Sequence, residues 1–101
     1  MGEKRHQLPP VHPGEILKED LDDVGVSMNR LARDIRVPMN RVSEIVNGKR
    51  AITADTALRL ARYFGTSAQY WLNLQLAYDL QVAARASAER IEREVLPLNA
   101  A

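Results

Sequence analysis

The chain has 101 residues, of which 46% are hydrophobic and 27% charged; its net charge is +1 and it contains no cysteine. This length suits a single domain whose hydrophobic core is stable without disulfides or bound metal ions. The lack of cysteine excludes disulfides, thiol chemistry and a zinc finger. No stretch resembles a signal peptide or is apolar for long enough to cross a membrane, so we expect a cytoplasmic protein without a membrane partner.

The N-terminal part is predicted to be an arm followed by a helix. Residues 1–11 are polar, carry two prolines and lack periodicity, so we expect them to be flexible. The first helix should begin at Pro13, because proline suits the first helical position, and end at Gly25. Its predicted core-facing positions are Ile16, Leu17, Leu21 and Val24.

Two short helices joined by a tight turn are predicted between Ser27 and Arg50. Ser27 is a natural N-cap, Pro38 would break a continuing helix but suits the first turn of a new one, and Gly48 closes the second helix. The apolar positions at helical spacing are Leu31, Ala32 and Ile35 in the first helix, and Val42, Ile45 and Val46 in the second.

Two more helices complete an all-α fold. Thr53 and Ser67 are the predicted N-caps, and Gly65 is the stop between the two helices. The apolar positions of the fourth helix are Ala57, Leu58, Leu60, Ala61 and Phe64. The fifth helix continues until Pro97 stops it, and it carries more apolar surface than one core-facing stripe requires. Residues 97–101 are expected to be a frayed tail, so the folded part spans residues 12–96.

One face of the helix after Pro38 has no role in the core. Its candidates for reading base edges are Met39, Asn40, Arg41, Ser43 and Glu44. Arginine suits guanine, asparagine suits adenine, glutamate accepts from cytosine, and methionine touches the thymine methyl group. Lys49 and Arg50 follow where phosphates would lie. The pattern favours a helix-turn-helix whose recognition helix spans Met39 to Asn47; the alternative is an ordinary helical hairpin with a solvated polar face.

Charge is distributed unevenly along the chain. Residues 27–50 hold six basic side chains and two acidic ones, a local charge of +4 that leaves −3 for the rest. The acidic side chains of the first helix are Glu15, Glu19, Asp20, Asp22 and Asp23. Such polarity would orient the protein on DNA with its basic face inward, although solvated surface charges give the same pattern.

No residue pattern indicates catalysis. His6 and His12 are the only histidines, and neither has a partner at metal-ligand spacing. The sequence contains no glycine-rich phosphate loop and no serine in a nucleophile elbow. We therefore expect no enzymatic activity, no metal and no cofactor.

Several stretches together closely resemble the HigA family of addiction-module antidotes, within the XRE (phage-repressor-like) helix-turn-helix class. They are HPGE at residues 12–15, SMNRLA at 27–32, RVSEIVNGKR at 41–50, TADTALRLA at 53–61 and WLNLQ at 71–75. The resemblance covers about residues 10–82. The helix-turn-helix is specific only to the class, whereas HPGE and WLNLQ together are more specific to this family.

The resemblance implies a five-helix repressor-like domain with an extended C-terminal helix. It also implies a homodimer that binds its own operator DNA and neutralises a HigB toxin, a small RelE-like ribonuclease that cleaves messenger RNA. Other functions stay open, namely a stand-alone XRE-type regulator without a toxin, a protein-only adaptor and, least of all, an enzyme. A neighbouring reading frame that encodes a small basic toxin would distinguish the first from the second.

The class pattern also assigns residues. Its base-facing positions correspond here to Met39, Asn40 and Glu44. The candidates for phosphate contacts, from the class and from position, are Ser27, Asn29, Asn47, Lys49 and Arg50. Two positions depart from the class. Met28 stands where a phosphate-binding glutamine is common, with Asn29 as the substitute. Arg36 stands where the turn usually has glycine, so either Arg36 adopts a left-handed conformation or the turn differs.

The fifth helix is the predicted dimer interface. Trp71, Leu74 and Tyr78 are expected to face the core, whereas the partner-facing residues are predicted to be Leu76, Leu80 and Ala83. Polar contacts from Asn73 and Gln75 are expected to tie this helix to a neighbour.

Overall fold

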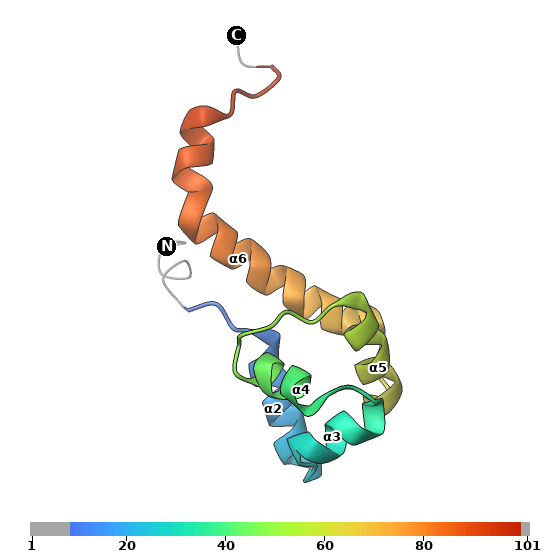
Figure 1. The fold of residues 1–101 in the computed structure, drawn as a ribbon. Helices are drawn as coiled ribbons and strands as arrows, with labels where there is room; N and C mark the ends of the chain where they lie inside the picture. The colour runs from blue at the N-terminus through green and yellow to red at the C-terminus, as the bar shows by residue number, and fades with distance from the viewer. Residues whose placement is uncertain (1–8, 100–101) are drawn as a thin grey trace.

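The computed structural model describes residues 9–99, so residues 1–8 of the predicted arm and residues 100–101 of the predicted tail lie outside the described part. The described chain consists of helices without strands. Their bounds are α2 Pro13–Val24, α3 Met28–Ile35, α4 Met39–Val46, α5 Ala54–Phe64 and α6 Ala68–Glu94. The first four form a compact group, and α6 leads away from it (Figure 1). The all-α prediction with an extended last helix is confirmed.

Side-chain caps set the starts of three helices as predicted. The hydroxyl groups of Ser27, Thr53 and Ser67 each accept a hydrogen bond from the backbone N–H three residues later, at 3.1, 3.4 and 3.0 Å. Pro38 differs slightly from the prediction. It occupies the N-cap position of α4 in an extended conformation, and the helix begins at Met39.

The start of α2 packs directly against the end of α4. His12 caps α2, because its Nδ1 accepts a hydrogen bond of 2.9 Å from the backbone N–H of Gly14. A Cβ atom on Gly14 would lie 1.8 Å from the carbonyl oxygen of Ile45. Only glycine lets the two backbones approach so closely. The HPGE stretch therefore positions α4 on the domain.

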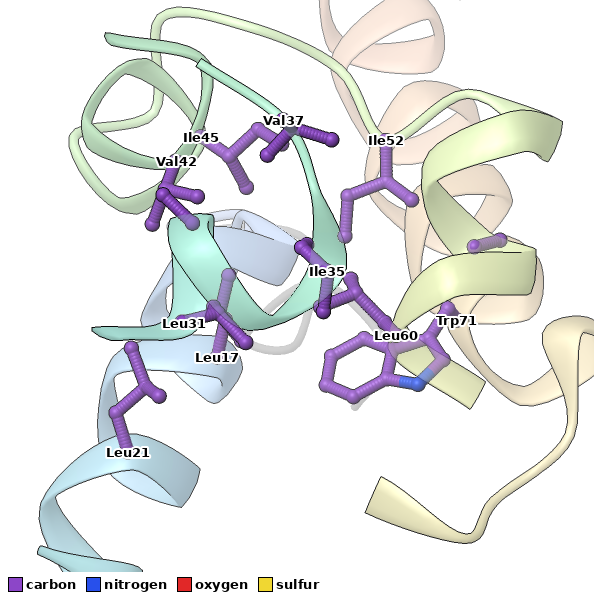
Figure 2. Packing of buried hydrophobic residues seen from close by; sticks show 12 residues of the cluster. Leu17, Leu21, Leu31, Ile35, Val37, Val42, Ile45, Ile52, Leu60 and Trp71 are labelled. Atoms are coloured by element: carbon purple, nitrogen blue, oxygen red, sulfur yellow. The ribbon is translucent and has the colours of Figure 1, made fainter. Parts of the chain in front are cut away.

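The core lies between α2, α3, α4 and α5, with Trp71 of α6 closing one side (Figure 2). Its fully buried hydrophobic side chains include Leu17, Leu21, Leu31, Val42, Ile45, Leu60 and Trp71. The indole Nε1 of Trp71 donates a hydrogen bond of 2.9 Å to the hydroxyl of Thr66. The largest core side chain therefore also satisfies its polar atom.

Two predicted core positions are wrong. Val24 is 57% exposed, because α2 ends there and Val26 folds back onto the core instead, donating its N–H to the Leu21 carbonyl at 3.0 Å. Leu58 is 63% exposed, because it points about 100° away from its neighbour Ala57, which faces the core. Ile16 and Val46 are half-buried.

Helix α6 has two parts with different surroundings. Its N-terminal part packs against α5 and α2, whereas its C-terminal part runs past the other helices (Figure 1) and gives the molecule dimensions of 57 × 27 × 23 Å. No described helix is both long enough and apolar enough to cross a membrane.

Candidate nucleic-acid interface

The turn between α3 and α4 is held by α5. Arg36 follows α3 with φ 64° and ψ 48°, so it takes the left-handed conformation, one of the two predicted alternatives. That conformation costs a non-glycine residue roughly 1–2 kcal/mol. Arg59 of α5 offsets the cost, since its Nη1 donates to the carbonyl oxygens of Ile35 at 2.8 Å and of Arg36 at 3.5 Å.

Helix α4 is anchored on one side and exposed on the other. Val42 and Ile45 are buried in the core. On the outer side, Met39 is 36% exposed and Asn40 is exposed. The remaining predicted base-reading residues, Arg41, Ser43 and Glu44, are half-buried. The N-terminal end of α4 is therefore its most accessible part, which is the end that enters the major groove in helix-turn-helix proteins.

Three of the predicted base-reading residues have partners within the protein that the sequence alone did not reveal. Glu44 accepts a hydrogen bond of 2.7 Å from Nε of Arg50. Arg41 lies with its Nη1 3.8 Å from Oδ2 of Asp55. The hydroxyl of Ser43 accepts a bond of 3.4 Å from the side-chain amide of Asn47. Two of these contacts join a predicted base reader to a predicted phosphate ligand, whereas Arg41 pairs with an acidic residue of α5.

The predicted phosphate ligands come from two places. Ser27 and Asn29 are exposed at the N-terminal end of α3, and Asn47, Lys49 and Arg50 are exposed after α4. Met28 packs against the core, so it is not available for the contact that glutamine makes in the class, whereas its neighbour Asn29 is. Gly48, with φ 74°, turns the chain between Asn47 and Lys49.

The acidic side of the protein is α2. Its side chains Glu15, Glu19, Asp22 and Asp23 are exposed. Burial, and then the nearby charge of Asp23, raises the pKa of Asp20. Within residues 9–99, no group of three or more histidine, aspartate or glutamate side chains is placed to hold a metal ion.

His12 has a structural role that its position in the sequence did not indicate. The residue is 7% exposed, and its ring lies edge-on against the ring of Tyr78 of α6, with centroids 4.8 Å apart. Burial lowers the pKa of His12, although Asp79, Glu15 and a backbone hydrogen bond at Arg50 act in the opposite direction. Because Nδ1 accepts the capping hydrogen bond, the arrangement suits the neutral imidazole.

The side of α6 that faces the domain carries the residues predicted to face the core. Trp71 is fully buried, Leu74 packs against the core, and Tyr78 is half-buried. Gln75 ties α6 to the segment before α5, because its side-chain oxygen accepts a bond of 2.7 Å from the N–H of Ile52. Asn73 is exposed instead, and its side-chain oxygen accepts a hydrogen bond of 2.8 Å from the side-chain amide of Gln69 within α6.

The opposite side of α6 exposes apolar side chains. Leu76 is 55% exposed and Leu80 is 61% exposed, and Ala83 is also exposed. An open hollow of about 400 Å³ continues this surface along the C-terminal part of the helix. It is lined by Leu80, Ala83, Ala84, Ala88, Ile91 and Glu92. These residues form an uncovered apolar strip in the single chain.

The two short helices α3 and α4, the turn between them and the outward face of α4 define a helix-turn-helix protein, and comparison with known sequences supports this class. The helix-turn-helix family matches residues 17–71. Virulence-associated protein I of Dichelobacter nodosus is 54% identical over 80 residues, which cover 78% of this chain and 74% of that protein.

Solved structures narrow the class to a family. An addiction-module antidote protein of the HigA family from Coxiella burnetii is 54% identical, with a TM-score of 0.87 over 89% of this chain and 99% of that one. The antitoxin HigA of Pseudomonas aeruginosa, solved with the higBA promoter, is 48% identical, with a TM-score of 0.85 over 88% of this chain and 98% of that one. The chain belongs to the HigA family of antitoxins.

Proposed function

We propose that this antitoxin represses its own operon by binding operator DNA as a homodimer, and that it neutralises a HigB-like toxin. The main observation in support of DNA binding is the exposed N-terminal end of α4, where Met39 and Asn40 lie outermost. The buried face of the same helix holds it on the domain. The Pseudomonas relative bound to the higBA promoter supports the same conclusion. An operator binder of this kind works in the cytoplasm.

In the proposed complex, α4 lies in the major groove. The base-reading residues would be Met39, Asn40, Arg41, Ser43 and Glu44, and the phosphate-binding residues would be Ser27, Asn29, Asn47, Lys49 and Arg50. The ion pair between Glu44 and Arg50 spans both groups. The hydrogen bond of 2.7 Å brings both side chains to one place on the surface, so Glu44 would act together with Arg50 at one site on the duplex.

A dimer is needed because one recognition helix contacts too few base pairs for useful specificity. Two helices related by two-fold symmetry would reach half-sites about 34 Å apart. The exposed side of α6, with Leu76, Leu80 and Ala83, is the proposed interface. A second copy would cover the apolar strip, which a lone domain would leave in water.

The acidic surface of α2 is the proposed first contact of the toxin. A ribonuclease that binds messenger RNA needs a basic surface, and opposite charges speed the association of two proteins. Glu15, Glu19 and Asp23 are exposed there. They lie on a helix other than the α3–α4 pair that would face DNA.

Two experiments test the proposal. Footprinting on the DNA upstream of the gene should show protection of two half-sites, and no protected segment would contradict repression. Co-expression with the adjacent small reading frame should yield a stable complex of the two proteins. Protection without a complex would leave a stand-alone regulator and remove the toxin from the proposal.

A further inference from the structure

Asp55 lies between two arginines that matter for the shape of the DNA-binding surface. It stands in the first turn of α5, and its side chain is 62% exposed. Oδ2 of Asp55 accepts a hydrogen bond of 2.8 Å from Nε of Arg59 and lies 3.8 Å from Nη1 of Arg41. Arg59 in turn donates to the carbonyl oxygen of Ile35 at the end of α3. One carboxylate oxygen therefore connects the recognition helix to the turn before it.

The position of Arg41 gives this carboxylate a consequence for DNA binding. The side chain of Arg41 is 33% exposed and belongs to α4. Without DNA, its guanidinium group is turned toward Asp55, which limits the directions that this long side chain takes. Asp55 also places a negative charge beside a helix that must approach phosphates, and like charges repel.

We propose that Asp55 determines the specificity of this surface: it positions Arg41 for a base edge and lowers the affinity for DNA of arbitrary sequence. The inference rests on the proposed function. Sequence-independent binding depends almost entirely on attraction to phosphates, so there the repulsion from Asp55 acts in full. On the operator, the repulsion is offset, because an arginine that is already oriented loses less side-chain freedom when it binds.

The test compares Asp55→Asn with the wild type on two DNA duplexes, measured by fluorescence anisotropy. One duplex is the footprinted segment upstream of the gene, and the other contains the same bases in scrambled order. At low salt, the variant should bind the scrambled duplex about two- to fivefold more tightly, the range expected for an exposed ion pair. Its affinity for the upstream segment should stay the same or fall, so the ratio of the two affinities decreases.

Two further variants separate this role from a general effect of charge or stability. Asp55→Glu keeps the carboxylate and should restore the wild-type ratio. Asp22→Asn removes a carboxylate that pairs with Lys18 at 2.7 Å in the last turn of α2, and it should leave the ratio unchanged. If Asp55 served only to stabilise the start of α5, both affinities would instead fall in parallel with the free energy of unfolding.

A double-mutant cycle gives the sharpest result. In an Arg41→Ala background, Asp55→Asn should no longer change the ratio, because only the repulsion from phosphates remains and it acts on both duplexes alike. An equal change on both duplexes, or the same change of ratio without Arg41, would overturn the inference. Equal affinity of the wild type for the two duplexes would overturn the proposed function itself, and this inference with it.

Discussion

The close approach of α2 to α4 predicts that Gly14→Ala is strongly destabilising. The added Cβ atom would lie 1.8 Å from the carbonyl oxygen of Ile45 and 2.7 Å from its carbonyl carbon, whereas carbon–oxygen contacts normally begin at about 3.3 Å. The obstructing atoms are backbone, so no side-chain rotation relieves the clash. The two helices must separate, and we expect the free energy of unfolding to fall by about 3 kcal/mol, toward the upper end of the overpacking range.

Gly25→Ala is the matched control at the other end of α2. Gly25 has φ 69°, but a Cβ atom there would meet nothing within 4 Å, so only the backbone conformation is penalised, by about 1 kcal/mol. Urea unfolding followed by circular dichroism measures both variants. Gly14→Ala should also weaken operator binding under conditions where it is still folded, because the clash displaces α4. If Gly14→Ala lowered the free energy of unfolding no more than Gly25→Ala does, HPGE would not position the recognition helix in this way.

Three further predictions concern DNA, dimerisation and pH. Asn40→Ala should weaken operator binding by about 1–3 kcal/mol and relax specificity at one base pair, whereas Lys49→Ala should weaken binding to all sequences and reduce its salt dependence; identical behaviour would refute the division of roles. Leu80→Glu should give a folded monomer by light scattering, and an unchanged dimer would exclude this interface. Burial lowers the pKa of His12, so the free energy of unfolding should decrease as the pH falls below about 6.5. The variant His12→Asn still caps α2 and should lose this pH dependence. If the variant kept the pH profile of the wild type, the role of His12 would be contradicted.

The helices were predictable because their signals are local. Ser27, Thr53 and Ser67 cap the helices that the sequence assigned to them, and the glycines at the ends adopt the left-handed conformation as expected. A cap depends on atoms within one turn of the chain. The core-facing residues between the caps followed from periodicity for the same reason.

The two wrong core positions have local causes: α2 ends at Val24, so Val26 takes its place against the core, and Leu58 points away from the side of α5 that Ala57 occupies. What the sequence did not show at all are contacts with distant parts of the chain. Gly14 looked like part of a helix start, whereas its close contact is with Ile45, far along the chain. Likewise, the partners of Arg41 and Glu44 became visible only once α4 and α5 were placed in space. The outward direction of Met39 and Asn40 was predictable, but the contacts that orient the other candidates were not.

The most direct test of the central claim is a titration of the wild-type protein with the upstream segment and its scrambled counterpart at two salt concentrations. The account predicts that two chains bind per upstream duplex, about 10³-fold or more tightly than to the scrambled one, and that raising the salt weakens both complexes steeply. Equal affinities for the two duplexes, or binding that does not respond to salt, would contradict the proposal that α4 reads operator DNA.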